Sequence, residues 1–181
     1  TEDIDPDDSI LDKTKARLPW LVLGLMGGFA AASIMGGFED ALTQYPELFY
    51  FTPLIAAMAG NVGVQSSAIV VQGLATNNIK GSMWSRMLKE IALSVVNGVV
   101  LAILIFLLGS IFQYHSDISM TISISLIIVI IIASLIGTFV PLILDKNGID
   151  PAVATGPFIT TSNDIFGIFI FFFVAKLILG F

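Results

Sequence analysis

An aspartate inside the last long apolar stretch of the chain is the residue with the clearest capacity for chemistry. The segment at 150–179 reads DPAVATGPFITTSNDIFGIFIFFFVAKLIL, and Asp164 follows the polar run TTSN. A carboxylate in the middle of a bilayer costs roughly 2.5 to 3.5 kcal/mol or more. No Lys or Arg occurs in the interior of an apolar stretch, so the partner must be water, a proton, backbone donors or a bound cation. We expect an ion-pathway role, with a protonated structural aspartate as the alternative.

The composition indicates a membrane protein. The 181 residues are 56% hydrophobic and 12% charged, whereas a soluble domain is about 45 to 50% apolar and about 25% charged. Acidic residues in the first dozen positions supply most of the net charge of -6. The absence of cysteine excludes disulfides and thiolate metal sites. We expect no enzymatic turnover and no nucleic-acid partner, and we interpret the chain as part of a longer protein because it lacks an initiating Met.

Five apolar stretches are long enough to cross a bilayer, which takes roughly 20 residues as a helix. They are continuous rather than alternating, which favours a helical bundle over a β-barrel. The predicted fold class is therefore an all-α integral membrane protein with five transmembrane helices per subunit. We expect residues 1–17 to form an acidic cytoplasmic linker or the end of a connecting helix, and residues 18–181 to form the pore domain. The predicted spans are 18–38, 53–76, 91–112, 118–144 and 151–179.

Basic residues predict on which side of the membrane each loop lies. They precede the first span or lie in the loops between spans two and three and between spans four and five: Lys13, Lys15, Arg17, Lys80, Arg86, Lys89 and Lys146. Basic loops are cytoplasmic by the positive-inside rule. We therefore expect a multi-pass protein of the cell (inner) membrane with a cytoplasmic N-terminus and an external C-terminus.

The second and fifth spans each carry small and polar residues on one helical face. At 100° per residue, one stripe of each span contains these residues: Ala57, Gly60, Asn61, Val64, Gln65 and Ala68 in the second, and Val153, Gly156, Pro157, Thr160, Thr161, Asp164 and Gly167 in the fifth. These stripes predict a pore lining. The alternative is that their amides and hydroxyls only bond across a helix interface.

Two other spans show different patterns. The fourth is apolar all round, so we expect it to face lipid or the bundle wall. The first repeats small residues at four-residue spacing, which predicts close packing against another helix: Gly24, Gly28, Ala32 and Gly36.

One carboxylate makes a sparse cation site, which favours a two-fold dimer, the commonest closed symmetry. Two Asp164 side chains would then meet across a central pore and favour a divalent over a monovalent cation. Mg²⁺ loses its waters reluctantly and is usually held by one or two carboxylates, whereas Ca²⁺ takes six to eight oxygens. Two carboxylates with carbonyls suit hydrated Mg²⁺ best, and Mn²⁺, Co²⁺ and Ca²⁺ stay open as alternatives.

Three stretches resemble the MgtE family of magnesium channels and transporters. PLIAAMAGNVGVQ at 53–65 and DPAVATGPFITTSNDIFG at 150–167 resemble the signature stretches of the family, and RLPWLVLGLMGGFAAASIMGGFE at 17–39 is similar to its first membrane helix. The resemblance implies a homodimer with a Mg²⁺ pore on the two-fold axis, lined by helices two and five. It implies that Asp164 is the pore aspartate and that the Gly60 carbonyl faces the ion.

The resemblance also shows two departures and two missing parts. Ala57 stands where relatives often carry glycine, which adds a methyl group to the pore, and Gln72 replaces an arginine. Family members usually carry a cytoplasmic N-terminal domain and a paired CBS module that close the pore, and we expect these regulatory partners outside the 181 residues.

Two rival functions would also depend on an aspartate inside the membrane. An exchanger that couples Mg²⁺ to Na⁺ or H⁺ would bind the ion at Asp164 just as a channel would. An intramembrane aspartyl protease needs two aspartates with offset acid and base roles, and this chain offers one per subunit and no GxGD motif.

Overall fold

The computed structural model describes residues 7, 9–77, 79, 81–151 and 156–181, and every secondary-structure element in these residues is a helix. Five of the helices are long and apolar enough to cross a membrane. They are α1 (Ile10–Gly36), α3 (Glu47–Ala75), α4 (Met83–Ile111), α5 (Ser116–Lys146) and α6 (Pro157–Leu179), and the short α2 (Glu39–Gln44) joins the first two. The predicted fold class, an all-α protein with five spans, is confirmed.

Three helices extend well beyond the apolar stretches that predicted them. α1 begins at Ile10, because the Ser9 hydroxyl accepts a hydrogen bond from the Asp12 N–H at 3.3 Å and caps the first turn. Residues 10–17 are thus continuous with the first span. α4 begins at Met83 behind the equivalent cap Ser82, and α3 begins at Glu47. In α1 and α4 a serine cap, rather than the edge of the apolar stretch, marks where the helix begins.

The last helix starts later than predicted, at Pro157 rather than at 151. Proline fits the first turn of a helix because it lacks the N–H that would go unpaired there, and it disfavours helical geometry in the residue before it. Gly156 accordingly has non-helical backbone angles, φ -101° and ψ -111°. Residues 152–155 lie outside the described residues, and with them the predicted lining residue Val153.

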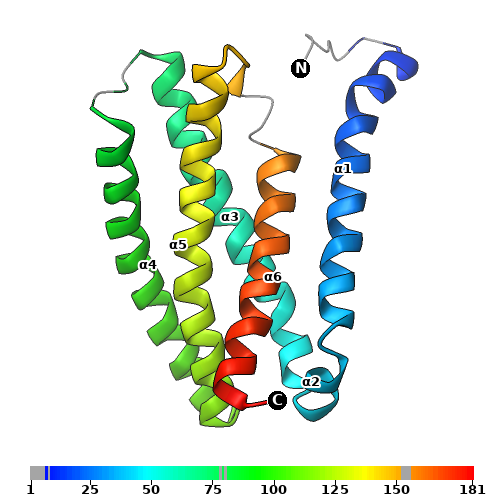
Figure 1. The fold of residues 1–181 in the computed structure, drawn as a ribbon, viewed down its shortest axis with the longest axis vertical. Helices are drawn as coiled ribbons and strands as arrows, with labels where there is room; N and C mark the ends of the chain where they lie inside the picture. Colours follow the sequence, from blue (N-terminus) through cyan, green and yellow to red (C-terminus); the bar gives the residue numbers. More distant parts are fainter. Residues whose placement is uncertain (1–6, 8, 78, 80, 152–155) are drawn as a thin grey trace.

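α5 lies at the centre of the bundle and packs against α3, α4 and α6 (Figure 1). The expectation that this apolar helix faces lipid or the bundle wall was wrong. Its all-round hydrophobicity reflects contact with protein on several sides, since a helix that is apolar all round suits a core as well as lipid. Small hydroxyl residues let its neighbours approach: Ser134 shares a 2.5 Å hydrogen bond with Ser94 of α4, and Ser123 donates to the Ala102 carbonyl at 3.1 Å.

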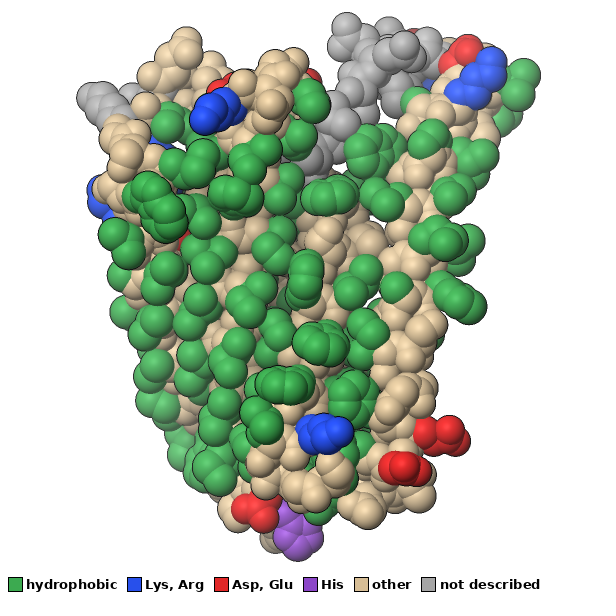
Figure 2. All heavy atoms as spheres, in the orientation of Figure 1, with side chains coloured by type: hydrophobic (Ala, Val, Ile, Leu, Met, Phe, Trp, Pro, Cys, Tyr) green, Lys and Arg blue, Asp and Glu red, His purple; other side chains and the backbone are tan. Residues whose placement is uncertain are grey.

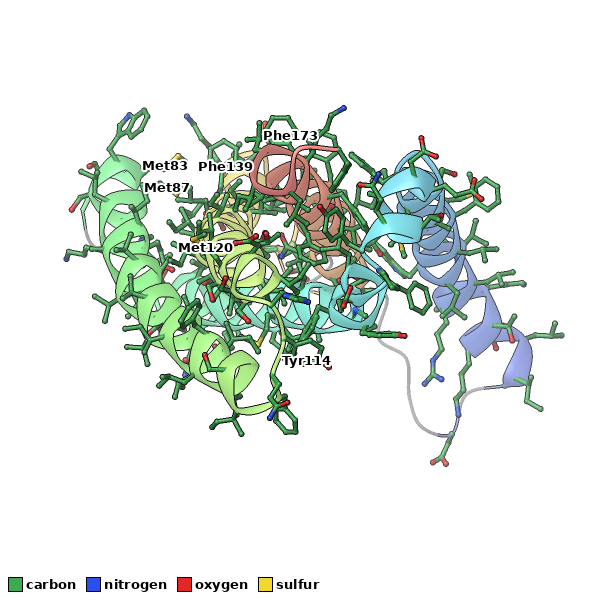
Figure 3. The ribbon with its side chains drawn as sticks, turned by 90° about the horizontal axis from the view of Figure 1, so that it is seen from below. Met83, Met87, Tyr114, Met120, Phe139 and Phe173 are labelled. Carbon is green, nitrogen blue, oxygen red and sulfur yellow. The ribbon has the colours of Figure 1, made fainter. Side chains whose placement is uncertain are left out.

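α1 and α4 lie at opposite edges of the bundle, as the view along its length shows (Figure 3). α4 packs against α5, and α1 packs against α6. α1 begins at one end of the bundle and α6 ends at the other (Figure 1), as an odd number of crossings requires. Hydrophobic side chains cover the middle of the visible face, and charged ones gather at its two ends (Figure 2).

The small residues of α1 contact α6 through a register different from the predicted one. A Cβ on Gly27 would overlap the Thr161 side chain, and one on Gly24 would lie 4.0 Å from Thr161 Oγ1, whereas one on Gly28 would have nothing within 4 Å. The close contact therefore follows Gly24, Gly27 and the buried Ala31. A helical face repeats every 3.6 residues, so spacings of three and four alternate along it.

Candidate cation site

A groove of about 370 Å³ opens between α3 and α6. Its walls combine small side chains, amides, a hydroxyl and one carboxylate, and the lining residues are Ala56, Ala57, Gly60, Asn61, Val64, Gln65, Thr160 and Asp164. The structure thus brings together seven residues that the stripes on the two spans predicted as neighbours. Ala56 is the member that sequence reasoning missed, since it lies at the edge of the α3 stripe.

Asp164 faces Gly60 across this groove. A Cβ on Gly60 would lie 3.6 Å from the Oδ1 of Asp164, and among the described residues no side chain apart from those of its two chain neighbours comes closer to that point. Glycine therefore leaves space beside the carboxylate in which water or an ion can lie. A side chain larger than a methyl group at this position would fill that space.

The carboxylate lies near the middle of the membrane-spanning length. Gly60 is 13 residues from Glu47 and 15 from Ala75, the two ends of α3, which puts it about 20 Å from either end at 1.5 Å per residue. Asp164 is only seven residues from the start of α6 at Pro157. The mid-depth position thus follows from contact with the centre of α3, because α6 itself begins inside the length that α3 spans.

The polar atoms of the groove are oxygen ligands and amides. Carboxylate and carbonyl oxygens are the ligands that Mg²⁺ and Ca²⁺ prefer. Thr160 uses its hydroxyl proton within its own helix, since its Oγ1 donates to the carbonyls of Pro157 at 3.2 Å and Gly156 at 3.3 Å, which leaves the oxygen lone pairs as acceptors. Among the residues that the structure describes, no Lys or Arg lines the groove. Among the described residues no three acidic or histidine side chains cluster, so one protomer offers a single carboxylate.

The remaining predicted residues of α6 face other helices. Thr161 packs against Gly24 and Gly27 of α1. Gly167 is buried, and a Cβ there would lie 3.1 Å from the Cβ of Ala59. Gly167 therefore allows close contact between α6 and α3 and is not among the residues that line this groove. The stripe drawn along the fifth span was wider than the face that the groove exposes.

Three further predicted residues are not among those that line the groove. Gly156 and Pro157 form the start of α6. Ala68 is exposed on α3, one turn after the lining residue Val64. Its position continues the same exposed face toward the end of the helix.

This exposed face of α3 is polar where lipid would require an apolar one. Ala57, Asn61, Gln65 and Ala68 are all exposed in the single protomer, although they lie in the central turns of a membrane-spanning helix. An amide that faces hydrocarbon loses its hydrogen bonds to water, which costs a few kcal/mol. The face therefore suits contact with water or with another polar surface.

Asn163 is a functional candidate that the sequence reasoning did not single out. It precedes Asp164, is 1% exposed, and neither its Nδ2 nor its Oδ1 has a hydrogen-bond partner within the described part of the chain. A buried amide without partners is destabilising by about 1 to 3 kcal/mol. The polar run TTSN before the aspartate was the available signal, but helical periodicity alone does not tell which neighbour Asn163 meets.

The fold and the groove together define a class of protein: a multi-pass helical membrane protein with a carboxylate in a polar groove between two of its spans. A family model, MgtE, described as a divalent cation transporter, matches residues 52–174. The chain belongs to this family. The match includes every residue that lines the groove, and it confirms the resemblance drawn from the signature stretches.

Three curated proteins, each called magnesium transporter MgtE, are similar to this chain. The Bacillus subtilis protein is 39% identical over 160 residues, 88% of this chain and 36% of the relative. Those of Enterococcus faecalis and Thermus thermophilus are 35% and 32% identical over 92% and 91% of this chain, and 37% and 36% of their own length. The chain thus spans little more than a third of these relatives. Their names point to a transporter rather than an enzyme.

Proposed function

We propose that this chain forms the conducting part of a Mg²⁺ channel. Two copies pair about a two-fold axis, α3 and α6 of each line the pore, and Asp164 from both holds the ion. The observation that carries the proposal is the groove itself: a mid-membrane carboxylate lies opposite a glycine and beside the exposed amides Asn61 and Gln65. A second copy would turn this open polar surface into an enclosed water-filled path.

The ligand chemistry favours a hydrated divalent cation. One carboxylate from each copy supplies up to two negative charges, and Gly60 leaves space beside each carboxylate. Mg²⁺ usually keeps several waters and binds through one or two carboxylates. Mg²⁺ therefore suits the site better than Ca²⁺, which prefers a fuller set of protein oxygens, and Mn²⁺ and Co²⁺ are the competitors of nearest size.

The pore would lie in the cell (inner) membrane, with its regulation on the cytoplasmic side. The basic loops put the N-terminus and the start of α1 on the cytoplasmic side, in the inner membrane, where regulatory domains of the kind that the family resemblance implies would act. Ala57 adds a methyl group to the groove wall and narrows the path relative to glycine.

The test is Mg²⁺ flux into liposomes that contain the wild-type chain, Asp164→Ala or Asp164→Asn, with Asp117→Asn outside the groove as the matched control. We expect both Asp164 variants to lose flux by about a hundredfold while they remain dimeric, since a neutral residue offers the ion little electrostatic stabilisation. Full flux in Asp164→Asn would overturn the proposal that the Asp164 carboxylate holds the ion. Wild-type flux that saturates and requires a counter-gradient of Na⁺ or H⁺ would indicate the exchanger instead.

A further inference from the structure

Three helices meet at Gly63, next to the groove. A Cβ on Gly63 would overlap the Nδ2 of Asn163 and lie 3.0 Å from the Cγ2 of Ile159, both on α6. From the other side, a Cβ on Gly137 of α5 would overlap the Gly63 carbonyl oxygen. A methyl group on Gly137 would therefore require α3 or α5 to shift, because it meets backbone, whereas one on Gly63 would displace the side chains of Asn163 and Ile159.

The side chains around this junction are polar, buried and without partners. Asn163 is 1% exposed, and Ser67, one turn after Gly63 on α3, is 0% exposed. Neither the amide of Asn163, nor the hydroxyl of Ser67, nor that of Thr138 beside Gly137 has a hydrogen-bond partner among the described residues. Buried polar groups in native proteins are nearly always hydrogen-bonded.

The position of Asn163 on α6 links this junction to the ion site. Asn163 and Asp164 are consecutive, so their side chains leave the helix about 100° apart. Asn163 faces Gly63 while Asp164 faces Gly60, three residues away on the same helix. Any rotation of α6 that moves one side chain moves the other. A rotation of 10° would shift an atom at the rim of the helix by about 1 Å.

We propose that Asn163 is the positioning residue of the cation site. Its amide, packed on Gly63, fixes the rotation of α6 against α3 and so holds the Asp164 carboxylate opposite Gly60. This inference rests on the proposed function, because it assigns Asn163 a role in the selectivity of the same site. Mg²⁺ demands near-ideal octahedral geometry while Ca²⁺ tolerates irregular geometry. Loss of the amide contact therefore lowers Mg²⁺ flux more than Ca²⁺ flux.

The first readout is the ratio of Mg²⁺ to Ca²⁺ flux in liposomes for Asn163→Leu, Asn163→Ala, Gly63→Ala and the double variant Gly63→Ala/Asn163→Ala. Asn163→Leu keeps most of the volume and removes the amide, and we expect the ratio to fall about tenfold, since displacement of a binding group by 1 Å is costly. In the double variant the ratio of Mg²⁺ to Ca²⁺ flux should fall no further than in Asn163→Ala alone, because both changes act through one contact.

The matched control is Gly98→Ala. Gly98 is also buried at a close helix contact, where a Cβ would lie 3.2 Å from the Cα of Ile127, but it joins α4 to α5 away from the groove. We expect a lower unfolding temperature with an unchanged flux ratio. The positioning role would be overturned by a wild-type flux ratio in Asn163→Leu. It would also be overturned if the flux ratio of the double variant fell by the product of the falls in Gly63→Ala and Asn163→Ala.

A second readout does not depend on transport. The chain has no cysteine, so the two thiols of a Gly60→Cys/Asp164→Cys variant can be joined by a short bifunctional thiol reagent. The yield of this cross-link reports how close the two positions lie. We expect efficient cross-linking in the otherwise wild-type background and several-fold less when Asn163→Leu is added. Unchanged cross-linking would overturn the inference even if the Asp164 variants show that the channel proposal is correct.

Discussion

Polar residues occur in two helix contacts of this bundle, and they behave differently in each. Between α4 and α5, Ser94 and Ser134 bond to each other and Ser123 bonds to a backbone carbonyl, all buried inside the protomer. Between α3 and α6, the amides of Asn61 and Gln65 and the Asp164 carboxylate open into a groove. In the first contact these hydroxyls are paired inside the protomer, whereas in the second the amides and the carboxylate face an open groove.

The difference also explains how the two contacts use glycine. Gly98 and Gly109 of α4 bring α5 close enough for hydroxyl contacts, with Gly109 facing Ser119. Gly60 does the opposite, since it faces a carboxylate and leaves an opening beside it. The same residue type allows close packing in one contact and provides space in the other.

The largest expected effect comes from making the groove apolar. In the double variant Asn61→Leu/Gln65→Leu, we expect Mg²⁺ flux into liposomes to fall about a hundredfold, because apolar constrictions in a pore lose their water. The matched control is Asn97→Leu, which removes an exposed amide from α4. Equal losses of Mg²⁺ flux in the two variants would show that the amides of α3 matter no more for conduction than the exposed amide of α4.

The next effect concerns how copies pair. We expect Ala68→Cys, on the exposed face of α3, to yield mostly disulfide-linked dimers under oxidising conditions. The proposed two-fold axis runs beside this face, and identical positions close to such an axis lie close to each other. A cysteine at Val100, which is 53% exposed on α4, should yield few. Gel electrophoresis without reductant measures both. Preferential cross-linking through Val100 would place the dimer contact on α4 instead.

Crowding of the three-helix junction should have a moderate effect on stability. We expect Gly137→Ala to lower the free energy of unfolding by about 1 to 3 kcal/mol, the usual range for overpacking, since its Cβ would overlap the Gly63 carbonyl. Gly28→Ala is the control, because a Cβ there meets nothing within 4 Å. Denaturant titration in detergent compares the two, and equal stabilities would contradict the tight junction.

The smallest effect is expected at the paired serines. Ser94→Ala should lower the free energy of unfolding by about 0.6 kcal/mol, the average for a hydrogen bond between membrane helices, and leave Mg²⁺ flux unchanged. A double-mutant cycle with Ser134→Ala isolates the pair energy. A change in flux would show that the α4–α5 contact also serves conduction.

Much of the site could be predicted from the sequence because helical geometry fixes which residues share a face. The spacing of Ala57, Gly60, Asn61, Val64 and Gln65 placed them on one stripe, and the structure finds them in one groove. The apolar stretches also predicted five spans, which the structure confirms. What these residues bind stays a prediction that the flux experiments test.

The sequence did not show which neighbouring helix each residue meets. Thr161 and Gly167 share the broad stripe with Asp164, yet one packs on α1 and the other on α3. The central place of α5 was missed for a related reason, since side chains buried in protein and side chains facing lipid are equally apolar.

The sequence by itself determined the solvent, the number of crossings and the residues that share each face, because these follow from hydrophobicity and from the geometry of a single helix. The tertiary structure decided which faces meet. It placed Asp164 against Gly60, turned Asn163 toward Gly63, and left the polar stripe of α3 exposed. These outcomes depend on how closely pairs of helices approach, and small residues such as Gly27, Gly63 and Gly137 set that approach through contacts between segments far apart in the chain.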